Sequence, residues 1–153
     1  MRDQAYELAE ILISTHPEDI KARAVLADIL YTDRQYRKAK EQYLIILEKD
    51  KTKSQIWSQV LFIQAEQNDF EEMLQTSKEA LEYFPSDPLF YYFNGISNKW
   101  AKNYNIAISS LKNGVDFVIE NQNLLLEFYS SLGDAYYATK QYKLSDEYYE
   151  KAL

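Results

Sequence analysis

The chain has 153 residues, of which 46% are hydrophobic and 27% are charged, a balance typical of a globular rather than a disordered protein. Its formal charge of −7 disfavours general nucleic-acid binding, and the absence of cysteine excludes disulfides, thiol catalysis and thiolate metal sites. No apolar run approaches the ~20 residues of a membrane-spanning helix, and the N-terminal residues do not resemble a secretory signal.

Apolar periodicity and helix-breaking residues predict nine helices and no strands. The predicted helices cover residues 3–14, 19–31, 35–48, 53–66, 69–83, 87–101, 104–118, 123–139 and 141–153. Capping residues agree with three of these starts, because Ser54, the pair Asn68-Asp69 and the pair Asp87-Pro88 are favoured where a helix begins. We therefore expect an all-α chain with short connections.

An internal repeat organises these helices. The aromatic residues Tyr36, Phe70 and Tyr104 follow one another at a constant interval, and Tyr142 comes after a slightly longer step. Three residues after each aromatic, and nine residues before it, the side chains are mostly small. These positions hold Ala39, Met73, Ala107 and Ser145, and Ala27, Leu61, Gly95 and Gly133, respectively. Small residues at both positions let paired helices approach each other closely.

The pattern resembles the tetratricopeptide repeat, in which each unit is a pair of antiparallel helices and whose period equals the interval between these aromatics. The fourth unit and the second unit carry the clearest matches: Tyr129-x2-Leu132-Gly133-x2-Tyr136 with Ser145-x3-Tyr149, and Trp57 with a closing Pro85. The resemblance covers essentially the whole chain. It implies a right-handed α-α superhelix, or TPR solenoid, of about nine antiparallel helices.

The repeat divides the chain into a half repeat and four full repeats within one solenoid domain, 1–153. These are 1–17, 18–51, 52–85, 86–123 and 124–153. Leu61 replaces a small residue, which predicts either a splayed helix pair or adjusted neighbouring side chains. Four extra residues around Ile119 to Asn123 predict a longer helix end or a longer turn, and a local kink in the superhelix.

The half repeat at the start and the apolar face of the last helix predict that the chain is a piece of a larger array. Its Tyr-rich and Asn-rich composition is similar to that of large bacterial repeat proteins, some of which are exported. A cytoplasmic location and a periplasmic or envelope location therefore both stay open, and self-association through uncovered terminal helices is one alternative.

Candidates for catalysis are weak. His16 is the only histidine and lies at the predicted end of a helix, where a cation is favoured. Adjacent carboxylates such as Glu71 and Glu72 do not converge on a helix. Three glycines cannot form a phosphate-binding loop. We predict a protein that is not an enzyme and has no cofactor or metal site.

In the tetratricopeptide family the first helix of each repeat lines a concave groove that binds proteins or peptides. Carried over residue by residue, the candidate partner-binding positions are Lys21, Asp28, Tyr31, Gln55, Phe62, Tyr92, Lys99, Glu127, Asp134 and Tyr137. The family's charged clamp for C-terminal carboxylates is missing, because Ala24, Asp28, Gln59, Leu89 and Phe93 hold its positions.

The expected groove is neutral to acidic with a stripe of aromatic residues, which suits an extended or helical peptide. Packing between neighbouring helices would also explain these rings. The sequence thus predicts a protein–protein interaction scaffold without nucleic-acid binding or membrane insertion. The alternative is a structural spacer or a self-association segment of a larger array.

Overall fold

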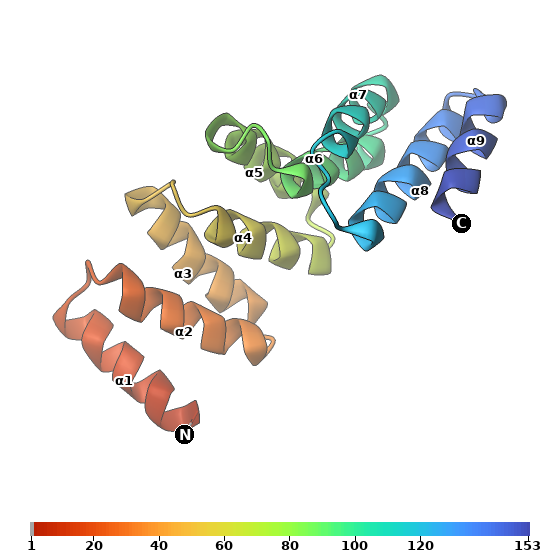
Figure 1. Ribbon diagram of the computed structural model, residues 1–153. Coiled ribbons are helices and arrows are strands. Elements are labelled where there is room, and N and C mark those ends of the chain that lie inside the picture. The colour runs from red at the N-terminus through yellow and green to blue at the C-terminus, as the bar shows by residue number, and fades with distance from the viewer. Residues whose placement is uncertain (1) are drawn as a thin grey trace. The chain divides into compact units, whose positions relative to one another are not determined.

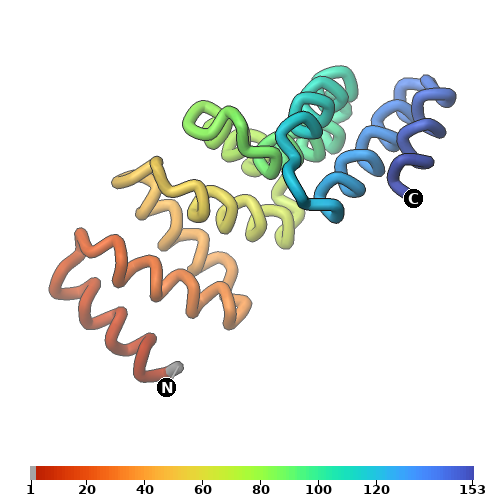
Figure 2. Tube along the Cα trace, in the orientation of Figure 1, coloured from red at the N-terminus to blue at the C-terminus, as the bar shows by residue number. Residues whose placement is uncertain are grey.

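The computed structural model describes residues 2–153, and within them it contains nine α-helices and no strand (Figure 1). The helices are α1 (Arg2–Thr15), α2 (Ile20–Thr32), α3 (Tyr36–Lys49), α4 (Ser54–Glu66), α5 (Phe70–Tyr83), α6 (Pro88–Trp100), α7 (Tyr104–Val115), α8 (Gln122–Ala138) and α9 (Tyr142–Ala152). Short turns join consecutive helices, as the Cα trace in Figure 2 shows. The sequence-predicted all-α repeat fold is confirmed, and every helix end except that of α7 lies within one residue of its prediction.

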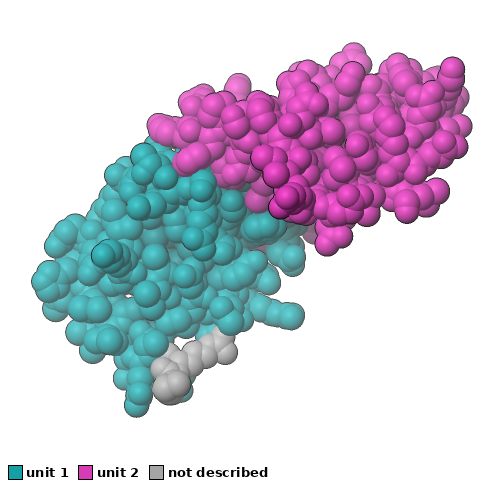
Figure 3. All heavy atoms as spheres, viewed as in Figure 1, with its two compact units in different colours: residues 1–66 teal, residues 67–153 magenta. Residues whose placement is uncertain are grey.

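The helices form two compact units, Met1–Glu66 and Gln67–Leu153 (Figure 3). In the first unit, α1 packs against α2, α2 against α3, and α3 against α4. In the second unit, consecutive helices from α5 to α9 pack in the same way, and α6 also contacts α8. The boundary falls between α4 and α5, inside the sequence-predicted repeat 52–85. The single-domain division, the splayed pair at Leu61 and the kink after α7 stay predictions.

Side chains cap the starts of four helices. Asp19, Asp69 and Asp87 accept hydrogen bonds from the backbone N–H groups of α2, α5 and α6, and Asn121 does the same for α8. The predicted caps at Asp69 and at Asp87, with a proline following Asp87, are thus present. Ser54 is instead the first residue inside α4.

The turn between the two helices of each repeat contains a residue with left-handed backbone. Arg34, Asn68, Lys102 and Lys140 have φ values of 58°, 55°, 62° and 60°, so the feature recurs with the repeat. In three of these turns the next N–H bonds to a carbonyl five residues earlier, for example from Asn103 to Asn98 at 2.9 Å. This is the Schellman ending of a helix, which usually has glycine at the left-handed position.

Small residues bring paired helices of the second unit together as the repeat predicts. A Cβ atom built on Gly95 would lie 2.5 Å from Cγ of Leu111, and one built on Gly133 would lie 2.6 Å from the ring of Tyr149. Leu111 in turn belongs to the buried core of this unit with Phe128, Leu132 and Tyr136. The close approach of α6 to α7 and of α8 to α9 therefore depends on glycine.

A polar network is buried in the same unit. The Asn94 carboxamide donates to Ser77 Oγ on α5 at 3.3 Å and accepts from Ser110 Oγ on α7 at 2.6 Å. Asn98 Nδ2 also donates to Asn94 Oδ1 at 3.1 Å. Asn94 occupies a position that is apolar in the other repeats, and its hydrogen bonds link three consecutive helices.

The connection between α7 and α8 differs most from its prediction. Helix α7 ends at Val115 rather than near residue 118, and residues 116–121 form an irregular segment in which Glu120 has a φ of 50°. Phe117 stacks on Tyr91 with ring centroids 5.7 Å apart. Of the predicted alternatives, a longer helix end or a longer turn, the longer turn is present, and Phe117 and Val118 pack outside any helix.

Candidate functional site

A cavity of about 490 Å³ lies in the second unit along α6 and α8, next to the start of α5. Tyr92, Ile96 and Lys99 share one face of α6, because they are four and three residues apart. The lining residues are Phe70, Tyr92, Ile96, Lys99, Trp100, Glu127, Ser130, Ser131 and Asp134. We call this cavity the α6–α8 groove.

Two carboxylates dominate the polar chemistry of the α6–α8 groove. Asp134 Oδ2 lies 2.6 Å from Lys99 Nζ, and Asp134 Oδ1 accepts a hydrogen bond from the Tyr149 hydroxyl at 2.7 Å. Glu127 Oε2 accepts a longer hydrogen bond, 3.3 Å, from the Tyr92 hydroxyl. With one lysine against two acids, the groove carries an excess of negative charge.

Tyr92 is mainly a packing residue. Its ring lies 5.5 Å from that of Phe128 and 5.8 Å from that of Phe93, in edge-to-face arrangements. Burial, and secondly the negative charge of Glu127, raises the pKa of the Tyr92 hydroxyl to about 12. For this member of the predicted aromatic stripe, packing between helices is sufficient to explain the ring.

Trp100 provides the exposed aromatic surface of the α6–α8 groove. Its side chain is 57% exposed and stacks on Phe70, with ring centroids 5.6 Å apart. Trp100 is not among the sequence-predicted residues, although it follows Ile96 by four residues and so continues the same helix face. Trp100 therefore leaves a large apolar surface uncovered beside the carboxylates of the groove.

Of the ten sequence-predicted residues, four line the α6–α8 groove: Tyr92, Lys99, Glu127 and Asp134. Tyr137, also in the second unit, does not line it. Its ring is 62% exposed and lies 5.4 Å from that of Tyr142.

The other five predicted residues lie on α2 and α4 of the first unit. The Asp28 carboxylate accepts a 2.6 Å hydrogen bond from the buried Tyr43 hydroxyl, and burial raises the pKa of Tyr43. The Tyr31 ring packs against the Tyr36 ring, with ring centroids 5.5 Å apart. Lys21 and Gln55 are exposed, and Phe62 is 40% exposed. Asp28 and Tyr31 therefore hold α2 against α3, and a continuous groove through all four repeats stays a prediction.

Within residues 2–153, no three His, Cys, Asp or Glu side chains are grouped closely enough to hold a metal ion. His16 is exposed, and its Nδ1 lies 3.0 Å from Thr15 Oγ1. None of the helices described is long and apolar enough to cross a membrane.

Comparison with solved structures shows the same fold in MamA and in the TPR protein YrrB. The crystal structure of MamA superposes with a TM-score of 0.85 at 15% identity, covering 99% of this chain and 86% of that one. MamA from Desulfovibrio magneticus RS-1 gives 0.82 at 13% identity, with 99% and 83% covered. YrrB, described as a TPR protein with an unusual peptide-binding site, gives 0.84 at 12% identity, with 99% and 76% covered.

No curated protein sequence matches the chain significantly. These structural likenesses confirm the tetratricopeptide-like fold that the repeat predicts. The model of one family, the TT21 fifth ARM repeats domain, matches residues 20–115, which is well over half of the chain. The chain therefore belongs to this family of helical repeat domains.

Proposed function

We propose that this protein is an interaction scaffold that binds a peptide segment of a partner protein in the α6–α8 groove. The observation that carries the proposal is the exposed Trp100, stacked on the half-buried Phe70, beside the carboxylates of Glu127 and Asp134 in one cavity. The indole and Ile96 offer apolar contact, and the carboxylates favour a segment with a basic or amide-donating residue. Micromolar affinity, about −8 kcal/mol, is expected for such a contact.

The fold supports this reading, because a stack of helix pairs presents one face of alternate helices as a binding surface. YrrB, which has this fold, is described as having a peptide-binding site. A structural spacer is the competing function, and the packing of Tyr92 against Phe93 and Phe128 favours it for that residue. Packing does not account for Trp100, which leaves more than half of its surface exposed.

Site-specific photo-crosslinking separates scaffold from spacer. A benzophenone amino acid placed at Ser130, an exposed residue of the groove, should capture a partner peptide that mass spectrometry identifies. The matched control is the same amino acid at Ser109, which is exposed on α7 outside the groove. Equal capture at both positions would contradict the proposal.

Trp100→Ala then tests the contact itself. Loss of a central tryptophan contact commonly costs about 2 kcal/mol of binding, so affinity for the captured peptide should fall about 30-fold. Stability should change by only about 1 kcal/mol, the value of one aromatic pair. A large fall in melting temperature without any change in peptide affinity would instead indicate a spacer.

A further inference from the structure

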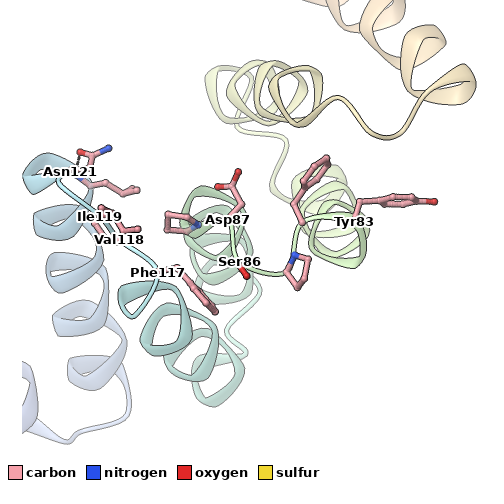
Figure 4. Close-up of a pocket in the computed structure, with 11 residues that line it drawn as sticks. Tyr83, Ser86, Asp87, Phe117, Val118, Ile119 and Asn121 are labelled. Carbon is pink, nitrogen blue, oxygen red and sulfur yellow. Dashed lines mark hydrogen bonds between the residues drawn. The ribbon is translucent and has the colours of Figure 1, made fainter.

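A second hollow, of about 610 Å³, lies where the α5–α6 turn faces the α7–α8 connection. Figure 4 shows Ser86 and Asp87 on the turn, and Phe117, Val118 and Ile119 on the connection. It shares no lining residue with the α6–α8 groove and is formed by the loops at the edge of the repeats. We call it the loop-edge hollow, and its volume is within the ~300–1,000 Å³ of small ligand sites.

The wall of the loop-edge hollow is made where the repeat period is broken. Helix α7 stops early, and the extra residues begin at Ile119. Phe117 stacks on Tyr91, and Val118 packs against the core, so internal packing explains both. Ile119 has no such explanation, because its side chain is 81% exposed. The inserted segment therefore presents apolar surface that the fold itself does not use.

The surroundings of this apolar surface are acidic. Asp87 is the charged residue in the lining, and one of its carboxylate oxygens caps α6 by accepting from Leu89 N–H. Glu120 follows Ile119 directly and lines a small adjoining hollow together with Val118. Residues 67–153 contain 13 acidic residues against seven lysines and no arginine, a formal charge of −6. Such a field attracts cationic groups and repels phosphates.

We infer that the loop-edge hollow is a docking surface for a peptide segment of a partner protein that carries a large apolar side chain flanked by Lys or Arg. The apolar side chain packs against Ile119, Phe117 and Pro88, which removes exposed hydrocarbon from water. The basic residues lie beside Asp87 and Glu120, which selects against acidic segments. This surface is independent of the α6–α8 groove, so either can operate without the other.

Three short synthetic peptides test the inference by titration of the isotope-labelled full chain, with amide chemical shifts as the readout. One has a Leu-Phe-Leu centre with Lys flanks, the second has the same centre with Glu flanks, and the third has Lys flanks around serines. The first peptide should give saturable shifts at Ser86, Ile119 and Asn121. The affinity of each of the other two peptides should be at least about tenfold lower than that of the first.

A matched pair of variants locates the contact. Ile119→Ser should weaken binding of the Lys-flanked apolar peptide about tenfold or more. Ile106→Ser removes an isoleucine that is 57% exposed on α7 outside the hollow, and it should leave binding unchanged.

Several results would overturn the inference: no saturable binding of the first peptide, equal binding of the Glu-flanked one, or equal loss in both variants. Shifts confined to Ile96 and Ser130 would place the peptide in the α6–α8 groove instead. The remaining alternative is that a second copy of this chain occupies the hollow, and light scattering over a dilution series tests it by measuring the molecular mass. Self-association that Ile119→Ser abolishes would show that a second copy of this chain fills the hollow, and would refute a foreign peptide.

Discussion

Gly95→Ala is the most informative single substitution in this chain, because two physical effects predict opposite signs. Gly95 lies in the middle of α6, where alanine is intrinsically favoured by up to ~1 kcal/mol. The new Cβ, however, would lie 2.5 Å from Cγ and Cδ2 of Leu111 on α7. That is about 1 Å inside the ~3.5 Å separation at which carbon atoms attract each other.

The packing effect should win. Leu111 is 0% exposed and packs in the core with Phe128 and Leu132, so its branching carbon cannot move without displacing them. Overpacking of this kind costs ~1–3 kcal/mol, and subtracting ~1 kcal/mol of helix propensity leaves a net destabilisation of up to about 2 kcal/mol.

Hydrogen exchange of the amides in α6 and α7 is the suitable assay. Helices in repeat proteins open locally, so a single unfolding free energy for the whole chain is not well defined. A loss of ~1.4 kcal/mol appears as tenfold faster exchange of amides that exchange through local opening.

The same substitution is also made in a variant that lacks the Leu111 side chain, so that the packing effect can be tested separately from helix propensity. Leu111→Ala removes the atoms that the new methyl group meets, so in that background Gly95→Ala should be neutral or stabilising by up to ~1 kcal/mol. Slower exchange on Gly95→Ala in the wild-type background would refute the packing argument. Equal destabilisation in both backgrounds would show that Leu111 is not the residue responsible.

Three further predictions concern helix ends and one tyrosine. Asp69→Ala removes the cap of α5, so the free energy of local opening of α5 should fall by about 1 kcal/mol, measured by hydrogen exchange of its amides. Lys102→Gly should raise the free energy of local opening of α6 and α7 by about 0.5–1 kcal/mol, because φ is 62° there, whereas Lys112→Gly inside α7 should lower it by ~1 kcal/mol; equal signs would contradict this. The folded state holds the Tyr92 proton more tightly, with a pKa of about 12 against 10.0, so this contribution to stability is complete below pH 10 and lost as pH rises through 12. Alkaline unfolding of Tyr92→Phe should therefore show a smaller fall in stability over this range, with Tyr137→Phe as the control that removes an exposed hydroxyl.

The helices were predictable because their apolar faces recur at a fixed interval. The end of α7 was predicted wrongly for a physical reason. Phe117 and Val118 continue the apolar pattern, but they are partly buried by packing from an irregular segment, and periodicity records burial rather than hydrogen bonding. The residues with left-handed backbone could not be predicted from the sequence. Glycine is usual at such helix ends, but Arg34, Lys102 and Lys140 occupy these positions here.

The candidate site was predictable where a helix face defines it. Tyr92, Lys99, Glu127 and Asp134 were placed on facing sides of α6 and α8 by repeat position alone, and they line one cavity. Position could not tell which aromatic rings would stay exposed. Tyr92 is turned into contacts with Phe128, while the unpredicted Trp100 carries the accessible surface. Exposure depends on neighbours that are distant in sequence.

The buried amide of Asn94 also bears on the order in which the helices stack. Units of similar length and pattern can in principle pair out of sequence, with one helix taking the place of its counterpart in the next repeat. Such slippage would set Asn94 against neighbours other than Ser77 and Ser110, so it would lose both hydrogen bonds to other helices and keep only the one from Asn98 on its own helix. The hydrogen bonds of Asn94 with Ser77 and Ser110 therefore favour one position of α6 in the order of the helices.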